Sequence, residues 1–497
     1  MLSTTGLVAL TFFSVTGGPF GQELVVKAAG PLFAILGYLG FSLAWSVPEA
    51  LMTAELSSAF PEAAGFAAWT NAAFGPLAAW IDAWCSWVSG VVDNALYPIL
   101  LLKYLEQVTD VFSGDDSSAL VARWTFTLGF VAVLTYLCHR GLDLTGRSAI
   151  ALSYFVLAPF AVFCVVAAPR VRPARWFRVR ADHHGTIRLR PWINNLFWNV
   201  NYYDSASAWA AEVDKDKWGS AMAASVALCT CASILPMLAA TGASDRTYHD
   251  YHNGAYVDVA RDLAGPWLAR WIVVSAAVAN VGLFVSEMSS DAYQLMGMAE
   301  RGLLPAALAK KSPTRGTPTS AILLSACGVL ALHSLTFEAI IATENLLYVC
   351  SMLLELAAFV QLRRKSPEFS RFSPRALLIF CLPASVLLLL VAAVQPPLVW
   401  MVAGALFLLG LLVYAVIGRT RRSNACGLHY KDLHEDWTAP RGTLASLCGW
   451  DDRFPSDARR ADTTTDPLHS SSSSSAAAAA AAASREPLVR DLSTALV

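Results

Sequence analysis

The chain has 497 residues, of which 56% are hydrophobic and only 15% are charged, and its net charge is −1. A soluble chain of this length would divide into several domains, and so few charged residues cannot supply each of them with a polar surface. This composition argues against a soluble enzyme, a secreted disulfide scaffold or a nucleic-acid-binding protein, because a nearly neutral chain does not attract polyanions. The apolar residues occur in long runs, which indicates an integral membrane protein.

Twelve apolar runs are predicted to be transmembrane helices, because a bilayer core about 30 Å thick needs about 20 mainly apolar residues per helix. The runs lie near 5–28, 31–57, 76–105, 122–138, 147–168, 192–212, 219–242, 265–299, 318–334, 337–361, 376–394 and 397–417. The segment 58–75 is small and apolar, and we expect a helical connector on the cytoplasmic side, with a re-entrant segment as the alternative. The sequence thus predicts an all-α integral membrane domain over residues 1–422.

The end of the chain differs in character from these runs. Residues 423–497 are polar and include Ser470–Ser475 followed directly by Ala476–Ala483. A homopolymeric stretch without apolar periodicity cannot bury enough surface to offset the entropy lost on ordering. We therefore predict a largely disordered cytoplasmic tail.

The placement of Lys and Arg favours cytoplasmic positions for both termini. If the N-terminus is inside, the inner loops and the start of the tail hold sixteen of these residues and the outer loops hold ten. Seven of the ten outer residues crowd into the loop 170–190, which runs against the positive-inside rule. The other loops after residue 75 obey the rule, and both termini are predicted to be cytoplasmic.

The first and sixth runs contain residues that interrupt a helix. The first reads TFFSVTGGPFGQELVVKAAG, with Gly17, Gly18, Pro19 and Gly21 in its middle. The sixth reads LFWNVNYYDSASAWAAEV, whose Asn, Asp and Ser side chains compete for backbone hydrogen bonds. A kink that serves only packing is one interpretation. Two breaks placed five helices apart instead match two inverted five-helix repeats of the LeuT-like type, in which broken helices form the transport site.

Carboxylates dominate the ionisable residues of the predicted helices, and the matching bases are few, chiefly Lys27 and Lys103 near helix ends. The acids are Glu23, Glu49, Glu55, Asp82, Asp93, Asp204, Glu212, Glu287, Asp291, Glu344 and Glu355. A carboxylate in the membrane is costly, so it either takes up a proton or meets a cation. This suits a proton-coupled carrier of organic cations, although each acid could instead serve an interhelical hydrogen bond. Glu49, Glu55 and Glu212 are expected near cytoplasmic ends, in gating or capping roles.

Several of these acids share a helix face with a second acid or with an aromatic ring, because residues four apart are neighbours on a helix. The pairs are Asp93 with Tyr97, Glu287 with Asp291, and Glu344 with Tyr348. Carboxylates would bind the spaced ammonium groups of a substrate, and aromatic faces would cover the methylenes between them. The candidate rings are Tyr97, Trp198, Tyr202, Tyr203, Tyr293 and Tyr348. Tyr and Trp also form interfacial belts, which is the alternative for each ring.

Six segments together resemble the polyamine uptake transporters of plants and protozoan parasites, in the amino acid–polyamine–organocation superfamily. They read GGPFGQE, AWSVPEALMTAEL, WVSGVVDNALYP, FWNVNYYDSAS, FVSEMSSDAYQLMGMAERGLLP and ENLLYVCSMLLE. The resemblance implies a twelve-helix inverted-repeat fold and proton-driven uptake of putrescine, spermidine or a related cation. It also implies a substrate site formed by Gly17, Gly18, Gly21, Glu23, Tyr202, Tyr203 and Asp204, with Asp93, Asn94, Tyr97, Glu287 and Asp291 from facing helices. The residue pattern adds Glu344 and Tyr348 to this set.

The predicted function is therefore proton-coupled uptake of polyamines by alternating access, with a small organic cation, protons and the lipid bilayer as partners. A carrier of cationic or neutral amino acids with the same fold is the first alternative, although Glu23 beside the first break disfavours a substrate carboxylate. A nutrient sensor that does not transport is the second. The predicted helices contain no GxSG or HExxH motif, and no CxxC pair occurs, so we expect neither an enzyme nor a metal or other cofactor. The expected location is the plasma membrane.

Overall fold

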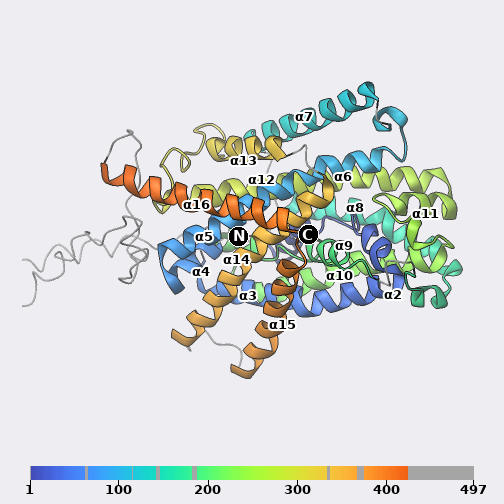
Figure 1. Cartoon of the computed structure of the whole chain (residues 1–497), viewed down its shortest axis with the longest axis horizontal. Coiled ribbons are helices and arrows are strands. Elements are labelled where there is room, and N and C mark those ends of the chain that lie inside the picture. The colour runs from blue at the N-terminus through green and yellow to red at the C-terminus, as the bar shows by residue number, and fades with distance from the viewer. Residues whose placement is uncertain are drawn as a thin grey trace, which may run out of the picture. The chain divides into compact units, whose positions relative to one another are not determined.

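The computed structural model describes seven stretches of the chain, which are helical apart from their connecting loops (Figure 1). They are residues 2–61, 65–114, 116–141, 146–181, 187–332, 336–365 and 374–423. Of the predicted tail, residues 423–497, all but Ser423 lie outside the described residues. No strand occurs within these stretches, so the prediction of an all-helical protein is confirmed for them.

The described stretches contain sixteen α-helices. In chain order they are α1 (Thr4–Val15), α2 (Glu23–Phe41), α3 (Val47–Ala59), α4 (Gly65–Phe74), α5 (Pro76–Asn94), α6 (Leu96–Leu105), α7 (Ser117–His139), α8 (Gly146–Ala167), α9 (Leu189–Trp198), α10 (Trp218–Ala243), α11 (Ala255–Ala264), α12 (Pro266–Glu300), α13 (Thr319–Leu332), α14 (Phe337–Lys365), α15 (Pro374–Ala393) and α16 (Pro397–Ser423). A π-helical turn, η1 (Ser42–Ser46), joins α2 to α3, and a 3₁₀ helix, η5 (Asp204–Glu212), follows α9.

Eight helical stretches of the described part are long and apolar enough to cross a membrane. They are Glu23–Ala59, Pro76–Leu105, Ser117–His139, Arg147–Arg170, Lys215–Ala243, Pro266–Glu300, Phe337–Arg364 and Pro397–Arg419. Three shorter apolar helices are Thr4–Val15, Thr319–Leu332 and Phe380–Ala393. These stretches confirm a multi-pass membrane protein. The segment expected as a connector contains α4, whose residues are largely buried against α5 and α14.

Both predicted breaks are present in the backbone. α1 ends at Val15 and α2 begins at Glu23, and the glycines between them have φ values of +54° (Gly17), +128° (Gly18) and +77° (Gly21). The sixth run is interrupted after Trp198. There the chain continues into η5 rather than into an α-helix. Since backbone with positive φ cannot continue a right-handed helix, the glycines themselves account for the first break.

A kink at Gly30 separates the first two predicted runs. Gly30 has a φ of +77°, and a Cβ atom there would lie 2.5 Å from the backbone nitrogen of Arg180. The loop that contains Arg178 and Arg180 forms backbone hydrogen bonds on both sides of the kink, from Arg180 N to Ala29 O (3.4 Å) and from Leu32 N to Arg178 O (3.1 Å). Only glycine fits so close to a neighbouring backbone. The kink thus allows the chain to turn where the sequence predicts two separate helices.

The third predicted run, 76–105, is divided into α5 and α6 at Ala95. Pro98 has no N–H group, so it cannot donate the helical hydrogen bond to the carbonyl of Asn94. The helix therefore loosens directly after Asp93 and Asn94, the two polar residues of this run that the sequence selects. This division places their side chains at an interruption of regular backbone.

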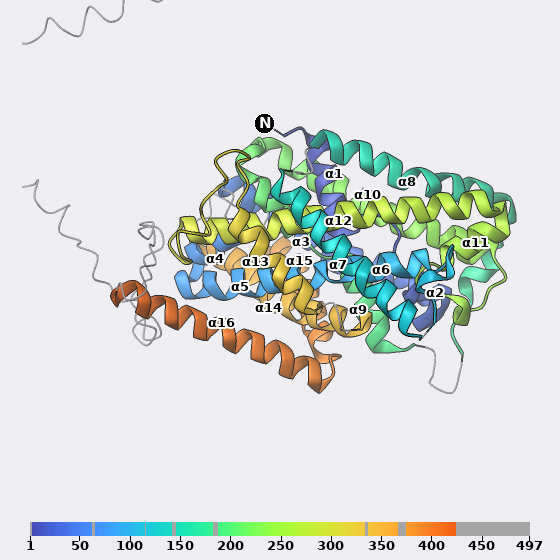
Figure 2. The same cartoon turned by 90° about the horizontal axis from the view of Figure 1, so that it is seen from above.

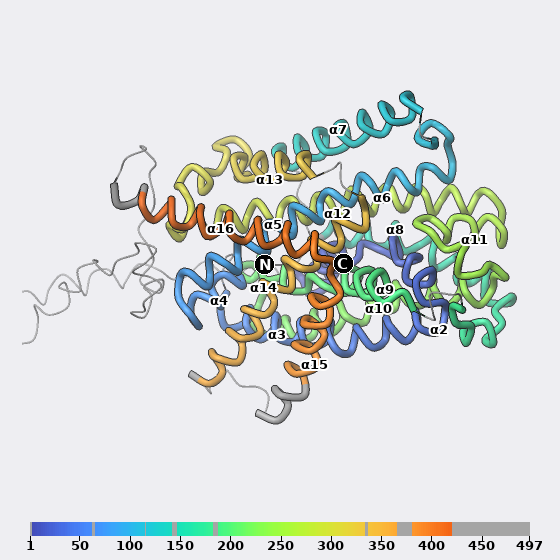
Figure 3. The backbone as a smooth tube through the Cα atoms, in the orientation of Figure 1, coloured from blue at the N-terminus to red at the C-terminus, as the bar shows by residue number. Residues whose placement is uncertain are grey.

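The helices that carry the breaks and the selected acids pack against one another. α1 and α8 lie beside α10 and α12 (Figure 2), while α5 packs against both α12 and α14. α7 and α13 lie side by side (Figure 3), and α16 is held to α5 by hydrogen bonds from Trp80 Nε1 to Gly410 O and from Trp84 Nε1 to Leu406 O, both 3.0 Å. The region between α1, α5, α12 and α14 therefore brings distant parts of the sequence together.

The arginine-rich loop 170–190 has a structural role that explains its composition. Arg170 donates to Leu263 O at 2.6 Å, Arg175 to Gly242 O at 2.9 Å, and Arg190 to Val394 O at 2.9 Å. These carbonyls lie at or just beyond the C-terminal ends of α11, α10 and α15, where cationic donors satisfy unpaired carbonyl groups. The cluster that runs against the positive-inside rule thus fastens helix ends.

Candidate functional site

A small cavity lies where the two breaks meet. It is lined by Ser14, Val15, Thr16, Asp93, Tyr97, Trp198, Asn199, Tyr202 and Leu283. These residues come from the end of α1, from α5 and α6, from the second break and from α12. The cavity volume is about 10 Å³, which is room for about one water molecule. The fold therefore places both breaks beside one small space lined by polar and apolar side chains.

Asp93 is held at this cavity by two aromatic donors. The indole Nε1 of Trp198 donates to Asp93 Oδ1 at 2.7 Å, and the hydroxyl of Tyr97 donates to Oδ2. Tyr97 lies one helical turn after Asp93, so this predicted pair is in direct contact. Gly21 of the first break lies against the same indole, because a Cβ atom there would be 2.7 Å from the Trp198 ring. The carboxylate thus joins α5 to the second break directly, and to the first break through the Trp198 ring.

Glu287 and Asp291 of α12 point together toward α5, as their spacing predicts. A Cβ atom at Gly90 of α5 would lie 2.3 Å from Asp291 Oδ1 and 2.6 Å from Glu287 Oε1. The glycine therefore leaves the space that the two carboxyl groups occupy. Asn94, in the last turn of α5, donates to Asp291 Oδ2 at 3.5 Å.

The second break lies against α14. Asn201 Nδ2 donates to Glu344 Oε1 at 3.2 Å, and the backbone N–H of Tyr202 donates to the hydroxyl oxygen of Tyr348 at 3.0 Å. The rings of Tyr202 and Tyr348 lie 4.5 Å apart. Tyr202 has a φ of +71°, the one positive φ of a non-glycine residue in the described ranges. Such strained backbone persists only where surrounding contacts hold it, and it is frequent at functional sites.

A group of buried acids surrounds this region without a basic partner. Its members are Glu49, Asp93, Asp204, Glu287, Asp291 and Glu344. Within the described ranges, none of them forms an ion pair with Lys, Arg or His. Several like charges in a space of low dielectric repel one another strongly. The group is therefore suited to receive cationic groups or protons from outside.

The remaining predicted site residues do not line this cavity. Glu23 is fully buried in a separate cluster, where its Oε1 accepts hydrogen bonds from the Tyr104 hydroxyl (2.7 Å) and from Gly254 N (3.1 Å). Gly17 and Gly18 form the first break and are packed against hydrophobic side chains. Tyr203 contacts Cys229 of α10, and the ring of Tyr293 faces Lys311.

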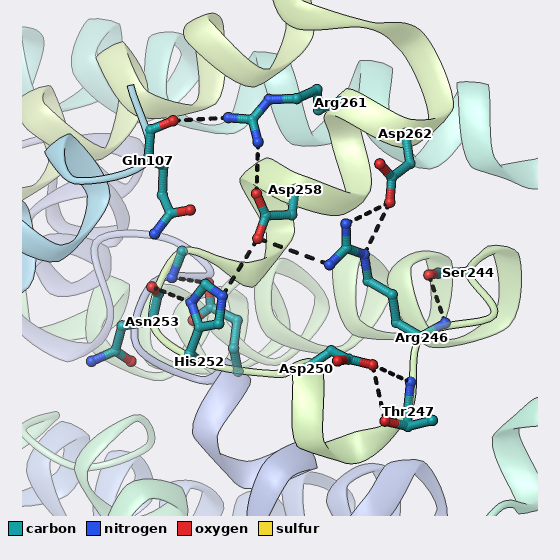
Figure 4. A network of polar contacts seen from close by, with 12 residues as sticks. Gln107, Ser244, Arg246, Thr247, Asp250, His252, Asn253, Asp258, Arg261 and Asp262 are labelled. Carbon is teal, nitrogen blue, oxygen red and sulfur yellow. Dashed lines mark hydrogen bonds and ion pairs between the residues drawn. The ribbon is translucent and has the colours of Figure 1, made fainter. Parts of the chain in front are cut away.

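A polar network covers the Glu23 cluster, formed by the loop before α11 and by α11 itself (Figure 4). At its centre, Asp258 lies 2.8 Å from Arg261 Nη1 and 3.4 Å from His252 Nε2. The hydrogen bond to Asp258 raises the pKa of His252 above its ordinary value of 6.5. Partial burial would raise the pKa of Asp258, but the hydrogen bond from His252 and the nearby arginine charges hold it below its ordinary value.

Glu49 is the main residue of this region that sequence reasoning left outside the site. The structure buries Glu49 completely, and its Oε1 accepts hydrogen bonds from Asp204 N (3.1 Å) and from the Tyr348 hydroxyl (2.8 Å). It thus caps the start of η5. The available signal was an acid in the middle of an apolar run, directly after Pro48. Glu55 instead forms a buried pair with Arg363, at 2.7 and 2.8 Å.

Comparison with known proteins agrees with this architecture. The family model of amino acid permeases matches residues 2–417. A probable polyamine transporter of Arabidopsis thaliana is 43% identical over 422 residues, which cover 83% of this chain and 86% of that protein. Polyamine transporter PUT1 of Oryza sativa subsp. japonica is 44% identical over 372 residues, covering 74% and 68%. An arginine/ornithine antiporter of Latilactobacillus sakei is 23% identical over 342 residues, covering 64% and 69%.

The match extends across the first helix, both breaks and the buried acids of α5, α12 and α14. Broken helices within a multi-pass helical bundle are typical of transporters. The chain therefore belongs to the amino acid permease family, in the amino acid–polyamine–organocation superfamily, and it is a transporter and not an enzyme.

Proposed function

We propose that the protein takes up polyamines such as putrescine or spermidine by alternating access and that protons drive this uptake. The observation that carries the proposal is the group of buried acids without a described basic partner, next to the aromatic rings of Tyr97, Trp198 and Tyr202. A polyamine supplies several ammonium groups and has no carboxylate, so its charges match the site. The names of the plant relatives support the same substrate class.

Within this proposal, each substrate ammonium group meets a carboxylate. Asp93 would bind one group, since the aromatic rings beside it also offer cation–π contacts. Glu287 and Asp291 would bind another from α12, and Glu344 would bind a third in the longer polyamines. The methylenes between the ammonium groups would lie against Tyr202 and Trp198.

The cavity is too small for such a substrate in this arrangement, because a space of about 10 Å³ holds about one water molecule. Binding therefore needs movement of the elements around the breaks. We propose that the broken helices belong to two inverted repeats within twelve transmembrane helices and move against the remaining bundle. In this proposal both termini are cytoplasmic and the protein resides in the plasma membrane.

Uptake into proteoliposomes tests the proposal. Purified full-length protein would be reconstituted and supplied with labelled putrescine, spermidine, arginine or leucine, with and without an acidic outside medium. We expect putrescine and spermidine to accumulate and the proton gradient to increase that accumulation. Since no other protein is present, transport would also argue against a sensor that does not transport.

A different outcome would favour a second substrate class. Accumulation of arginine without accumulation of putrescine would contradict the proposal and indicate a carrier of cationic amino acids, as the similarity to an arginine/ornithine antiporter would suggest. Leucine is the control for a neutral amino acid, because it carries no second positive charge. Uptake that is equal with and without the pH gradient would contradict the proton coupling but not the substrate class.

A further inference from the structure

Glu49, Tyr348 and Asp204 form a buried hydrogen-bonded group that connects three separate elements. Glu49 belongs to α3, Tyr348 to α14, and Asp204 is the first residue of η5. The hydroxyl oxygen of Tyr348 lies 2.8 Å from Glu49 Oε1 and 2.5 Å from Asp204 Oδ1. All three side chains are buried, with exposed fractions of 0% for Glu49 and Tyr348 and 1% for Asp204.

The number of hydrogen atoms available determines the protonation state of this group. Tyr348 has one hydroxyl hydrogen, and its oxygen already accepts the backbone N–H of Tyr202 at 3.0 Å. The phenol can therefore donate to one carboxyl oxygen only. The second oxygen–oxygen contact is also of hydrogen-bond length, and without a proton it would bring lone pairs together. One of the two carboxyl groups must supply that proton.

No neighbouring cation offers another explanation. The titratable side chains that face the group from the packed elements are Asp82 of α5, Glu355 of α14, Glu287 of α12, and Tyr203 and Cys229. Each of these is acidic or neutral, and the Asp82 carboxyl receives its own donors from Thr70 and Ser351. Arg363, a buried arginine near the end of α14, is held by Glu55. A proton is therefore the positive charge that fits the described surroundings.

We propose that Glu49 and Asp204 share one proton through Tyr348 and that this group is the site of the transported proton, separate from the carboxyls that bind ammonium groups. The coupling role rests on the proposed function, whereas the shared proton does not. The geometry links the two sites through adjacent residues of the second break. Asn201 donates to Glu344 in the substrate site. Tyr202 contacts Tyr348 of the proton site, and Asp204 is itself part of that site.

Loss of the proton would leave two carboxylates against one hydroxyl, and their repulsion would displace the break from α3 and α14. Tyr202 is the point at which this displacement would begin, since its positive φ is strained and its amide is held by Tyr348. Release of the proton would thereby move the backbone that carries Asn201 and Tyr202 next to the substrate. This is the physical link by which a proton gradient would act on substrate binding.

Infrared difference spectroscopy of the purified protein, between neutral and alkaline pH, tests the shared proton without any transport. We expect the carbonyl band of a protonated carboxyl group in the wild type, with one component missing in both Glu49→Gln and Asp204→Asn. The matched control is the double variant Glu55→Gln, Arg363→Met, which removes an ion-paired carboxylate from the same helix as Glu49 and should leave the band unchanged. A spectrum of Glu49→Gln that retains every wild-type component would overturn the proposal.

Transport tests the coupling. For one coupled proton, with the membrane potential held at zero by permeant ions, an inward gradient of about one pH unit can accumulate a substrate about tenfold at equilibrium. We expect Glu49→Gln to exchange labelled for unlabelled putrescine but to lose this accumulation, and Glu344→Gln to bind spermidine more weakly while it retains the gradient effect. Gradient-driven accumulation by Glu49→Gln equal to that of the wild type would overturn the coupling role. A wild type that shows the infrared band but moves no putrescine would contradict the proposed function instead.

Discussion

The indole of Trp198 donates a hydrogen bond of 2.7 Å to the carboxylate of Asp93, and this contact joins the second helix break to the end of α5. The two residues are 105 positions apart in the sequence. The same indole lies against Gly21 of the first break, so one side chain connects both interruptions to an acid. A change at any of these three positions is therefore expected to affect the whole site.

Replacement of Glu287 by Gln should weaken the transport of putrescine. A hydrogen bond to a charged group contributes about 1.5–3 kcal/mol, so we expect kcat/KM to fall by roughly 10- to 100-fold. Initial rates of uptake by proteoliposomes measure this effect. Glu106→Gln is the control, because Glu106 pairs at the surface with Lys103. Unchanged kinetics in Glu287→Gln would remove this residue from the substrate site.

Replacement of Gly21 by Ala should disrupt the first break. The backbone there has a φ of +77°, and the added methyl group would lie 2.7 Å from the Trp198 ring. We expect lower thermal stability in detergent and a loss of putrescine uptake, since the ring must move away from Asp93. Gly129→Ala is the matched control in α7, where nothing lies within 4 Å of the added Cβ atom. That variant should be as stable as the wild type or up to about 1 kcal/mol more stable.

The network over Glu23 should make stability depend on pH through His252. Its pKa is raised above 6.5 by Asp258, so the charged imidazole is favoured in the folded state. The resulting stabilisation is complete below the unfolded-state pKa and is lost as the pH rises through the higher folded-state pKa. Thermal unfolding of His252→Gln should lack this decrease. A wild-type melting temperature with the same pH profile as His252→Gln would contradict the role of the imidazole.

The buried pair of Glu55 and Arg363 should be sensitive to the loss of one partner. Each side chain is less than a tenth exposed, and the pair ties α3 to α14. Removing only the charge of Glu55 takes the carboxylate of this pair away from a buried guanidinium, which costs about 3–5 kcal/mol, whereas replacement of both partners by uncharged residues costs much less. Thermal unfolding of Glu55→Gln and of the double variant Glu55→Gln, Arg363→Met compares the two cases. Equal melting temperatures for the two variants would contradict this account.

Local features of the sequence were sufficient to predict that the described part of the chain is helical and where both breaks lie, whereas the number of transmembrane helices stays a prediction. An apolar run of sufficient length predicts a helix, and Gly17, Gly18 and Gly21 predict an interruption, because both properties belong to the backbone of the segment itself. The pairs Asp93 with Tyr97 and Glu287 with Asp291 share a helix face for the same reason. The tail remains a prediction, since it lies outside the described residues.

Contacts between helices determine which side chains meet at the site, and the sequence alone does not predict these contacts. Glu23 lies in the first break by sequence, yet tertiary packing directs its carboxylate to Tyr104 and Gly254, away from Asp93. Glu49 follows a proline in an ordinary apolar run, yet it meets Asp204 and Tyr348 across two helix interfaces. The period of a helix assigns a side chain to a face of that helix, but which neighbour covers the face depends on how all the helices pack together.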